Sequence, residues 1–264
     1  MARGLWIAAS IASLAAAIAV SAQIATPSAD AAAQQSGTAE KVAQSASATG
    51  ASGARTLEVE AAIYMDDQIR TNRSGEAQIR LLDDTRLVVG PNARLTIDAF
   101  VFNGRTAETV TLSAVRGAFR FITGNSRKQA YLLKTPVMTI GVRGTGLDGF
   151  VEPGTGRTTI AIYEGAAELC DAGGRCQVFE ETCGVTIPPG GGFEDPSPAS
   201  RALLFPYAGS QASLLPEFRL DTSGCRTVRL PSDSPESSGG GGGTPTPSGG
   251  GSTGGGGRGQ SGGG

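Results

Sequence analysis

The stretch KTPVMTIGVRGTGLD, residues 134–148, decides the fold of this chain. Met138, Ile140 and Val142 alternate with their neighbours in a run of β-forming residues, and a period of two predicts a strand. Pro136 supplies no backbone N–H, so this end cannot lie in the middle of a central ladder. The glycines of Arg143-Gly144-Thr145-Gly146 then predict a turn or a bulge. The stretch offers no nucleophile, metal ligand or acid–base pair.

Short segments of the same kind recur on both sides of this stretch. They lie at residues 57–63, 68–71, 77–82, 86–89, 94–102, 109–114, 117–122, 130–134, 158–163 and 166–170. Gly, Asp, Asn or Pro separates them about every eight to twelve residues, which is typical of an all-β sandwich or barrel. The sequence therefore predicts one β domain over 56–170, an antiparallel two-sheet sandwich that is jelly-roll-like. About 115 residues of this composition can form one core unaided.

The segments also repeat internally. Residues 111–121 align with 159–169, each reading strand, charged residue, glycine, strand, and residues 90–95 align with 141–147. Two such matches predict two related halves. A β-solenoid is the alternative, but its periods are usually about 20 to 30 residues and recur at least three times, which favours the sandwich.

The two ends of the chain differ from this domain. Residues 1–22 have one charge, Arg3, before an apolar run that ends in Val20-Ser21-Ala22, the pattern of a cleaved signal peptide. The alternative is a retained N-terminal anchor, although the run is shorter than the ~20 residues that span a bilayer. Residues 23–55 are rich in Ala and Ser and are expected to form a flexible leader, and residues 232–264 a disordered Gly-, Ser- and Pro-rich tail.

Composition excludes several classes of function. The 264 residues carry a formal net charge of −2 and contain no histidine. The charge argues against nucleic acid as a partner. The missing histidine excludes histidine triads, histidine-ligated metals and histidine pH switches. We expect no cofactor and no bound metal.

Four cysteines, Cys170, Cys176, Cys183 and Cys225, follow the main body of the β domain. An even number in an exported chain predicts two disulfides, and the spacing does not fit a zinc site. Sequence alone leaves three pairings open. The pairing of Cys170 with Cys176 and of Cys183 with Cys225 is favoured, because residues 171–174 read as a hairpin turn.

The remaining segment, 171–231, is expected to be a cysteine-containing extension. Residues 177–181 and 185–187 predict one more hairpin. Residues 196–216 place a few leucines and Phe205 among prolines and polar residues. This pattern predicts irregular chain with at most a short helix, lying over the β core and held there by Cys225.

The order of motifs in the β domain resembles the FecR family of extracytoplasmic domains. The motifs are Asp67 to Thr71, Ala77 to Leu82 with the turn at 83–85, the Arg116-Gly117 step, Thr135-Pro136, Gly141 to Thr145, and Tyr163 to Gly165. One departure is Asp84, where the family usually has glycine. The resemblance implies a β-rich, sandwich-like fold without known catalysis. The founding regulators of the family join this domain to a membrane helix and a segment that controls a sigma factor.

The turn at Arg143, Gly144 and Thr145 has two interpretations. Consecutive glycine-rich amides can form an anion-binding nest. The Walker pattern is absent and no helix start follows, which favours a structural turn. Asp66-Asp67 and Asp83-Asp84 could be acid–base or calcium-binding pairs, but both pairs fall where turns are expected, which favours a turn-forming role.

The sequence therefore predicts a periplasmic or secreted, non-catalytic binding or structural module of the bacterial cell envelope. Its expected partner is an envelope protein or polysaccharide. No nucleic acid is expected, and no stable membrane insertion once the signal peptide is cleaved. The alternative function is an extracytoplasmic regulator that senses an outer-membrane receptor, and a carboxylate-dependent envelope hydrolase is a third.

Overall fold

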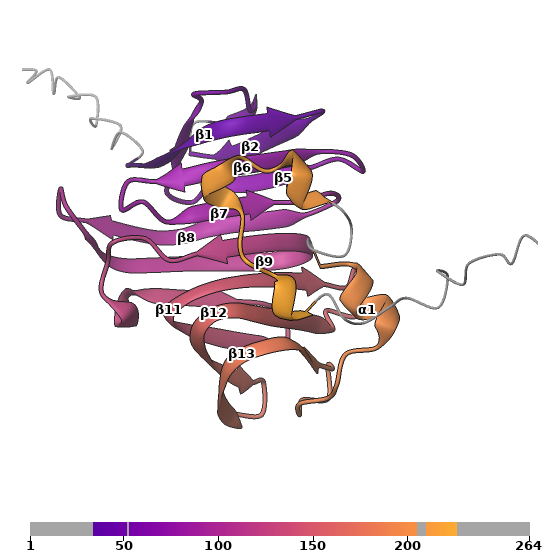
Figure 1. The fold of residues 1–264 in the computed structure, drawn as a ribbon. Helices are drawn as coiled ribbons and strands as arrows, with labels where there is room; N and C mark the ends of the chain where they lie inside the picture. Colours follow the sequence, from indigo (N-terminus) through magenta and orange to yellow (C-terminus); the bar gives the residue numbers. More distant parts are fainter. Residues whose placement is uncertain (1–33, 52, 205–209, 226–264) are drawn as a thin grey trace, which may run out of the picture.

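The computed structural model describes residues 34–51, 53–204 and 210–225 (Figure 1). The strands are β1 Gln35–Ala43, β2 Ala46–Gly50, β3 Gly53–Thr56, β4 Ala62–Tyr64, β5 Gln68–Thr71, β6 Glu76–Leu81, β7 Arg86–Val89, β8 Arg94–Phe102, β9 Ala107–Ile122, β10 Tyr131–Lys134, β11 Met138–Val151, β12 Thr158–Asp171 and β13 Cys176–Ile187. Helix α1 spans Pro198–Ala202, and single 3-10 turns lie at Lys128–Ala130, Ser210–Ser213, Pro216–Phe218 and Ser223–Cys225. The predicted signal peptide and the glycine-rich tail lie outside the described residues.

The prediction of an all-β domain is confirmed. Within the described residues the strands form one 13-stranded sheet, so the division into two separate sheets is not observed. The long strand β9 explains why. Its N-terminal half pairs with β8 and, in parallel, with β10, whereas its C-terminal half pairs with β7 and β11. The N-terminal half of β9 with β8 and β10 is here called one limb of the sheet, and the C-terminal half of β9 with β7 and the C-terminal half of β11 is the other. The sheet is continuous because β9 belongs to both limbs.

The long strands change limb at glycines with positive φ. Gly117 bends β9 at φ +84°, Gly144 bends β11 at φ +74°, and Gly165 bends β12 at φ +72°. A Cβ atom on Gly165 would lie 1.9 Å from the carbonyl oxygen of Gly144. Only glycine fits there, because other residues avoid this φ and the backbone leaves no space for a side chain.

Both limbs contribute to one hydrophobic core. Leu87 and Phe121 come from one limb and Ile97 and Tyr131 from the other, and all are almost fully buried. The rings of Phe121 and Tyr131 meet edge to face, with centroids 5.6 Å apart. Both parts of the 13-stranded sheet therefore share one hydrophobic core.

The prediction of a flexible leader over 23–55 is wrong for residues 35–50 and 53–55, and residues 23–33 lie outside the described residues. Strand β1 pairs with β4 and β6, and β2 pairs with β3 and β5 (Figure 1). Ala39, Ala46 and Ala48 are at most 1% exposed. Small side chains suffice in these strands, because the existing sheet supplies backbone partners and the neighbouring strands supply the larger apolar groups.

The hairpin predicted from residues 177–181 and 185–187 is not observed, because both segments belong to one continuous strand, β13. Strand β13 pairs along the length of β12, and an isolated bridge joins Thr186 to Glu194. Residues 210–225, here called the strap, run across β6, β7 and β9 on the outer side of the sheet (Figure 1). Leu214 and Phe218 of the strap bury Val88 and Ala118 beneath them. The predicted covering segment was 196–216, and only its last residues, 210–216, lie in the strap, which ends at Cys225 and is held there by the disulfide to Cys183.

Candidate functional site

The bend of β11 contains the three residues that sequence singled out as a candidate turn. Thr145 is buried, and its hydroxyl donates to the carbonyl of Ala166 and accepts from the amide of Arg143 at 3.3 Å. The amide of Thr145 donates to the hydroxyl of Thr123 at 3.1 Å. An anion-binding nest would present the backbone amides of Arg143 and Thr145 to a ligand. Here both amides donate to hydroxyl groups of the protein instead. Thr145 therefore positions the bend, while the side chain of Arg143 points outward and is 54% exposed.

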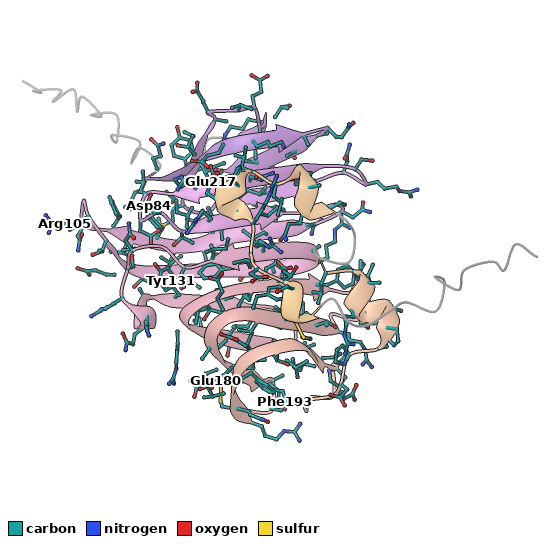
Figure 2. All side chains as sticks on the ribbon, viewed as in Figure 1. Asp84, Arg105, Tyr131, Glu180, Phe193 and Glu217 are labelled. Atoms are coloured by element: carbon teal, nitrogen blue, oxygen red, sulfur yellow. A yellow bond between two sulfur atoms is a disulfide. The ribbon has the colours of Figure 1, made fainter. Side chains whose placement is uncertain are left out.

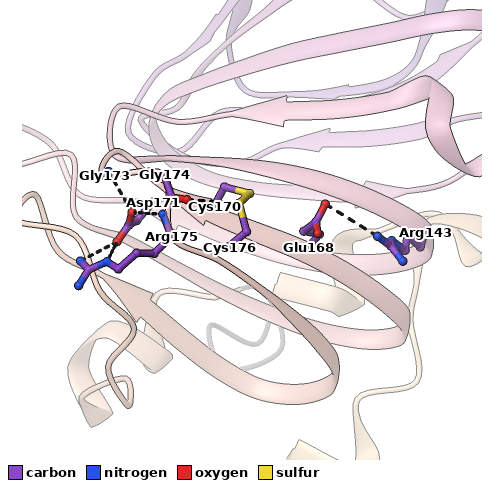
Figure 3. The surroundings of a disulfide bond; sticks show 8 residues. All are labelled: Arg143, Glu168, Cys170, Asp171, Gly173, Gly174, Arg175 and Cys176. Atoms are coloured by element: carbon purple, nitrogen blue, oxygen red, sulfur yellow. Dashed lines mark hydrogen bonds and ion pairs between the residues drawn. A yellow bond between two sulfur atoms is a disulfide. The ribbon is translucent and has the colours of Figure 1, made fainter.

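A groove of about 750 Å³ lies beside this bend. Its walls come from the 3-10 turn before β10 and from strands β10 to β13. Lys128, Leu132, Arg143, Glu168, Val178 and Glu180 are among the lining residues. Arg143 and Glu168 approach to 3.8 Å, an exposed ion pair that contributes little to stability (Figure 3). The groove thus offers charged groups of both signs around the half-buried Leu132 and the exposed Val178.

The predicted disulfides are present in the favoured pairing. Cys170 and Cys176 join β12 to β13 at directly opposite positions, next to the turn that connects these strands (Figure 3). Cys183 of β13 joins Cys225 at the end of the strap. The first disulfide closes a hairpin, and the second fixes the strap to the sheet. Such bonds persist in oxidising compartments.

The turn after Cys170 is organised by Asp171. Its carboxylate accepts hydrogen bonds from the amides of Gly173, Arg175 and Gly192, at 2.9, 3.0 and 2.8 Å. The Arg175 guanidinium adds an ion pair at 2.7 Å (Figure 3). The amides of Gly192 and Arg175, followed by this guanidinium, lower the pKa of Asp171 to about 2. The carboxylate therefore fixes the hairpin and the chain that follows β13.

A buried ion pair beneath the strap was missed by sequence reasoning. Arg120 of β9 and Asp148 of β11 are fully buried, and the guanidinium donates from Nε and Nη2 to the two carboxylate oxygens at 2.6 and 2.8 Å. The remaining Nη1 donates to the Gln211 side chain at 2.6 Å and to the Phe218 carbonyl at 3.0 Å, both in the strap. Burial raises the pKa of Asp148, and hydrogen bonds from Arg120 and Tyr163 oppose that rise.

The aspartate pairs considered as acid–base or calcium-binding groups contribute to the fold. Asp66 and Asp84 adopt positive φ in turns. The Asp67 carboxylate pairs with Arg55, and Asp83 accepts hydrogen bonds from Ser126 and Tyr131 at 2.7 and 3.0 Å. Among the described residues, no group of three or more Cys, Asp or Glu side chains could hold a metal ion. Within the same residues, no helix is long and apolar enough to cross a membrane.

Comparison with known protein families matches the part of the chain that contains the bent strands β9, β11 and β12. The family model described as FecR protein matches residues 67–168, from the start of β5 almost to the end of β12. The chain contains a FecR domain. The match begins at the Asp67 motif and includes the bends at Gly117, Gly144 and Gly165. It supports an extracytoplasmic, signalling-related role for the FecR domain.

Solved structures give weaker similarities. Two crystal structures of a candidate anti-sigma factor from Parabacteroides distasonis ATCC 8503 are 13% identical, with a TM-score of 0.41. The alignment covers 49% of this chain and 59% of that one. A cell surface anchoring domain is 24% identical over 23% of this chain and 82% of its own, with a TM-score of 0.22. The search of curated proteins found no match.

Proposed function

We propose that this protein is an exported, non-catalytic binding module of the cell envelope, and that its FecR domain contacts a partner through the groove beside the Arg143 bend. The observation that carries the proposal is the groove itself, a recess of about 750 Å³ lined by strands β10 to β13 and the turn before β10. Exposed loops and bends on a rigid scaffold are where binding residues concentrate. The partner class is an envelope protein or an envelope polysaccharide.

The lining of the groove supports binding rather than chemistry. Lys128 and Arg143 line the recess together with Glu168 and Glu180, and Val178 is 45% exposed. An apolar contact surrounded by charges of both signs matches the composition of a protein interface, where charges select the partner and apolar groups add affinity. The two disulfides support export, because cytosolic thiols are kept reduced.

The test is crosslinking and pull-down from intact envelopes. The test variant is Lys128→Glu/Arg143→Glu, which reverses both positive charges of the groove. Its matched control is Arg73→Glu/Arg105→Glu, two exposed arginines that form no ion pair among the described residues. We expect the test variant to lose a partner that the wild type and the control both retain. A partner captured equally by all three proteins, or by none, contradicts the proposal.

A second candidate is a membrane-tethered signalling regulator, and the FecR match over residues 67–168 is the observation that favours it. The two candidates differ at the N-terminus of the mature protein. Sequencing that terminus from purified envelopes distinguishes them. A start at Gln23 or near Ala31 supports the exported module, whereas an intact Met1 in the inner membrane supports the regulator.

A further inference from the structure

Three arginines lie side by side on neighbouring strands of the sheet. Arg70 of β5 is directly opposite Arg94 of β8, and Arg94 is directly opposite Arg116 of β9. Neighbouring strands are about 4.8 Å apart, and opposite Cβ atoms lie within about 5.5 Å of each other. Arg70 is exposed, and Arg94 and Arg116 are half-buried. These three residues, here called the arginine row, concentrate positive charge just before the bend at Gly117.

The arginine row is without carboxylate partners among the residues that the structure describes. Other arginines are paired there, for example Arg80 with Glu40 and Arg120 with Asp148. Arg70 donates only to the side chain of Gln68, at 2.7 Å. The Nε atoms of Arg94 and Arg116 are buried and have no hydrogen-bond acceptor among the described residues. The row thus contains unused donors as well as unbalanced charge.

This arrangement is unfavourable for the protein alone. Like charges directly opposite each other destabilise a sheet. The pKa of Arg94 is lowered, first by burial and then by the charges of Arg70 and Arg116. An anion bound across the row removes the repulsion and supplies acceptors for the unused N–H groups.

We propose that the arginine row binds a ligand that carries two or more neighbouring phosphate groups. Guanidinium groups match phosphate oxygens in paired hydrogen bonds, and a phosphate offers three acceptor oxygens where a carboxylate offers two. Three guanidinium groups on adjacent strands suit an acceptor with many oxygens in a small space. β5, β8 and β9 each have partners on both sides, so an added peptide strand is not the occupant.

The arginine row is separate from the groove, which lies over β10 to β13. The proposal therefore does not rest on the proposed function. The experiment is isothermal titration calorimetry of the full chain with sodium tripolyphosphate, and with orthophosphate as the single-phosphate comparison, at physiological ionic strength. The test variants are Arg94→Gln/Arg116→Gln and the single exposed Arg70→Gln. The control, Arg105→Gln/Arg127→Gln, removes the same charge from exposed arginines elsewhere; Arg105 projects from the loop between β8 and β9 (Figure 2).

We expect saturable tripolyphosphate binding to wild type, weakened about tenfold or more by Arg94→Gln/Arg116→Gln and changed by less than about twofold in the control. Arg70→Gln weakens binding in the same direction, and because its side chain is exposed this variant tests the row even if the double variant folds poorly. Orthophosphate binds more weakly than tripolyphosphate. Absence of saturable binding, equal losses in test and control variants, or equal affinity for the two anions overturns the proposal.

Discussion

Arg120 and Asp148 form a fully buried ion pair that joins β9 to β11 and also holds the strap. The two hydrogen bonds between them measure 2.6 and 2.8 Å, and the remaining guanidinium nitrogen reaches Gln211 and Phe218. A buried charge is costly unless it is paired and hydrogen-bonded. The buried Arg120 guanidinium therefore keeps all of these hydrogen bonds only when the strap is in place.

Removing one partner of this pair is expected to destabilise the fold strongly. Asp148→Ala leaves the Arg120 charge buried without its carboxylate and should lower the free energy of unfolding by about 3–5 kcal/mol. Urea denaturation measures the change. Glu194→Ala is the control, because its ion pair with Arg157 is exposed and should cost no more than about 1 kcal/mol. Equal effects of the two substitutions would show that the buried pair has no special role.

The bend of β12 is expected to require glycine for two separate reasons. Gly165→Ala combines positive φ with a Cβ atom 1.9 Å from the Gly144 carbonyl oxygen, whereas Gly154→Ala has φ +88° and no atom within 4 Å. Gly154→Ala should cost about 1–2 kcal/mol from backbone strain alone. Gly165→Ala should cost clearly more, because the backbone must also move. Thermal unfolding measures both, and similar melting temperatures for the two variants would contradict the close approach.

The disulfide at the end of the strap is expected to matter more than the disulfide in the hairpin. Cys183 and Cys225 are 42 residues apart, whereas Cys170 and Cys176 are six apart, and in the chain-entropy model longer loops are stabilised more. Cys183→Ser/Cys225→Ser should cost roughly 2–4 kcal/mol.

Amide hydrogen exchange shows which part of the protein loses stability when the Cys183–Cys225 disulfide is removed. The amide of Leu215, which donates to Gln78 at 2.9 Å, should exchange faster in Cys183→Ser/Cys225→Ser. Amides in the centre of β9 should change least, and Cys170→Ser/Cys176→Ser should leave Leu215 protected. Unchanged protection of Leu215 after loss of the Cys183–Cys225 bond would mean that the disulfide does not hold the strap.

The carboxylate of Asp171 predicts a pH dependence at the end of the hairpin. Its pKa is about 2 in the folded protein and ~3.9 in an unfolded chain, so its contribution is complete above about pH 4 and is lost as pH falls toward 2. Asp171→Asn should melt below wild type at pH 6, and the difference should shrink as pH falls through this window. Melting curves between pH 6 and 2 measure it. A difference in melting temperature that does not change with pH would show that lost packing, and not the carboxylate charge, destabilises Asp171→Asn.

The bends and the disulfides could be read from the sequence for physical reasons. Glycine tolerates positive φ, so the repeated charged-residue–glycine step at Gly117 and Gly165 marked positions that proved to be bends. The hairpin turn after Cys170 brought two cysteines to opposite positions, and the export predicted from residues 1–22 made a disulfide the expected result. Alternation over residues 137–142 predicted a strand there, and Met138, Ile140 and Val142 are core residues of β11.

Two features depended on tertiary contacts that no local pattern reveals. Strands β1 to β3 contain few large apolar residues, and Ala39 and Ala46 become core residues only because other strands surround them. Arg120 occupies an outward position between Phe119 and Phe121, which alone predicts a solvent-exposed side chain. The strap covers that position from about 90 residues further along the chain. A charged residue between two core aromatics was the only local signal.

The central claim is that the groove beside the Arg143 bend is the contact surface for an envelope partner. Photo-crosslinking at single positions in intact envelopes tests it most directly. A benzophenone side chain replaces Val178 in the groove or, as the control, Val101 on β8, which are 45% and 48% exposed. We expect a discrete crosslinked product from position 178 and none from position 101. The same products from both positions, or none from position 178, would contradict the claim.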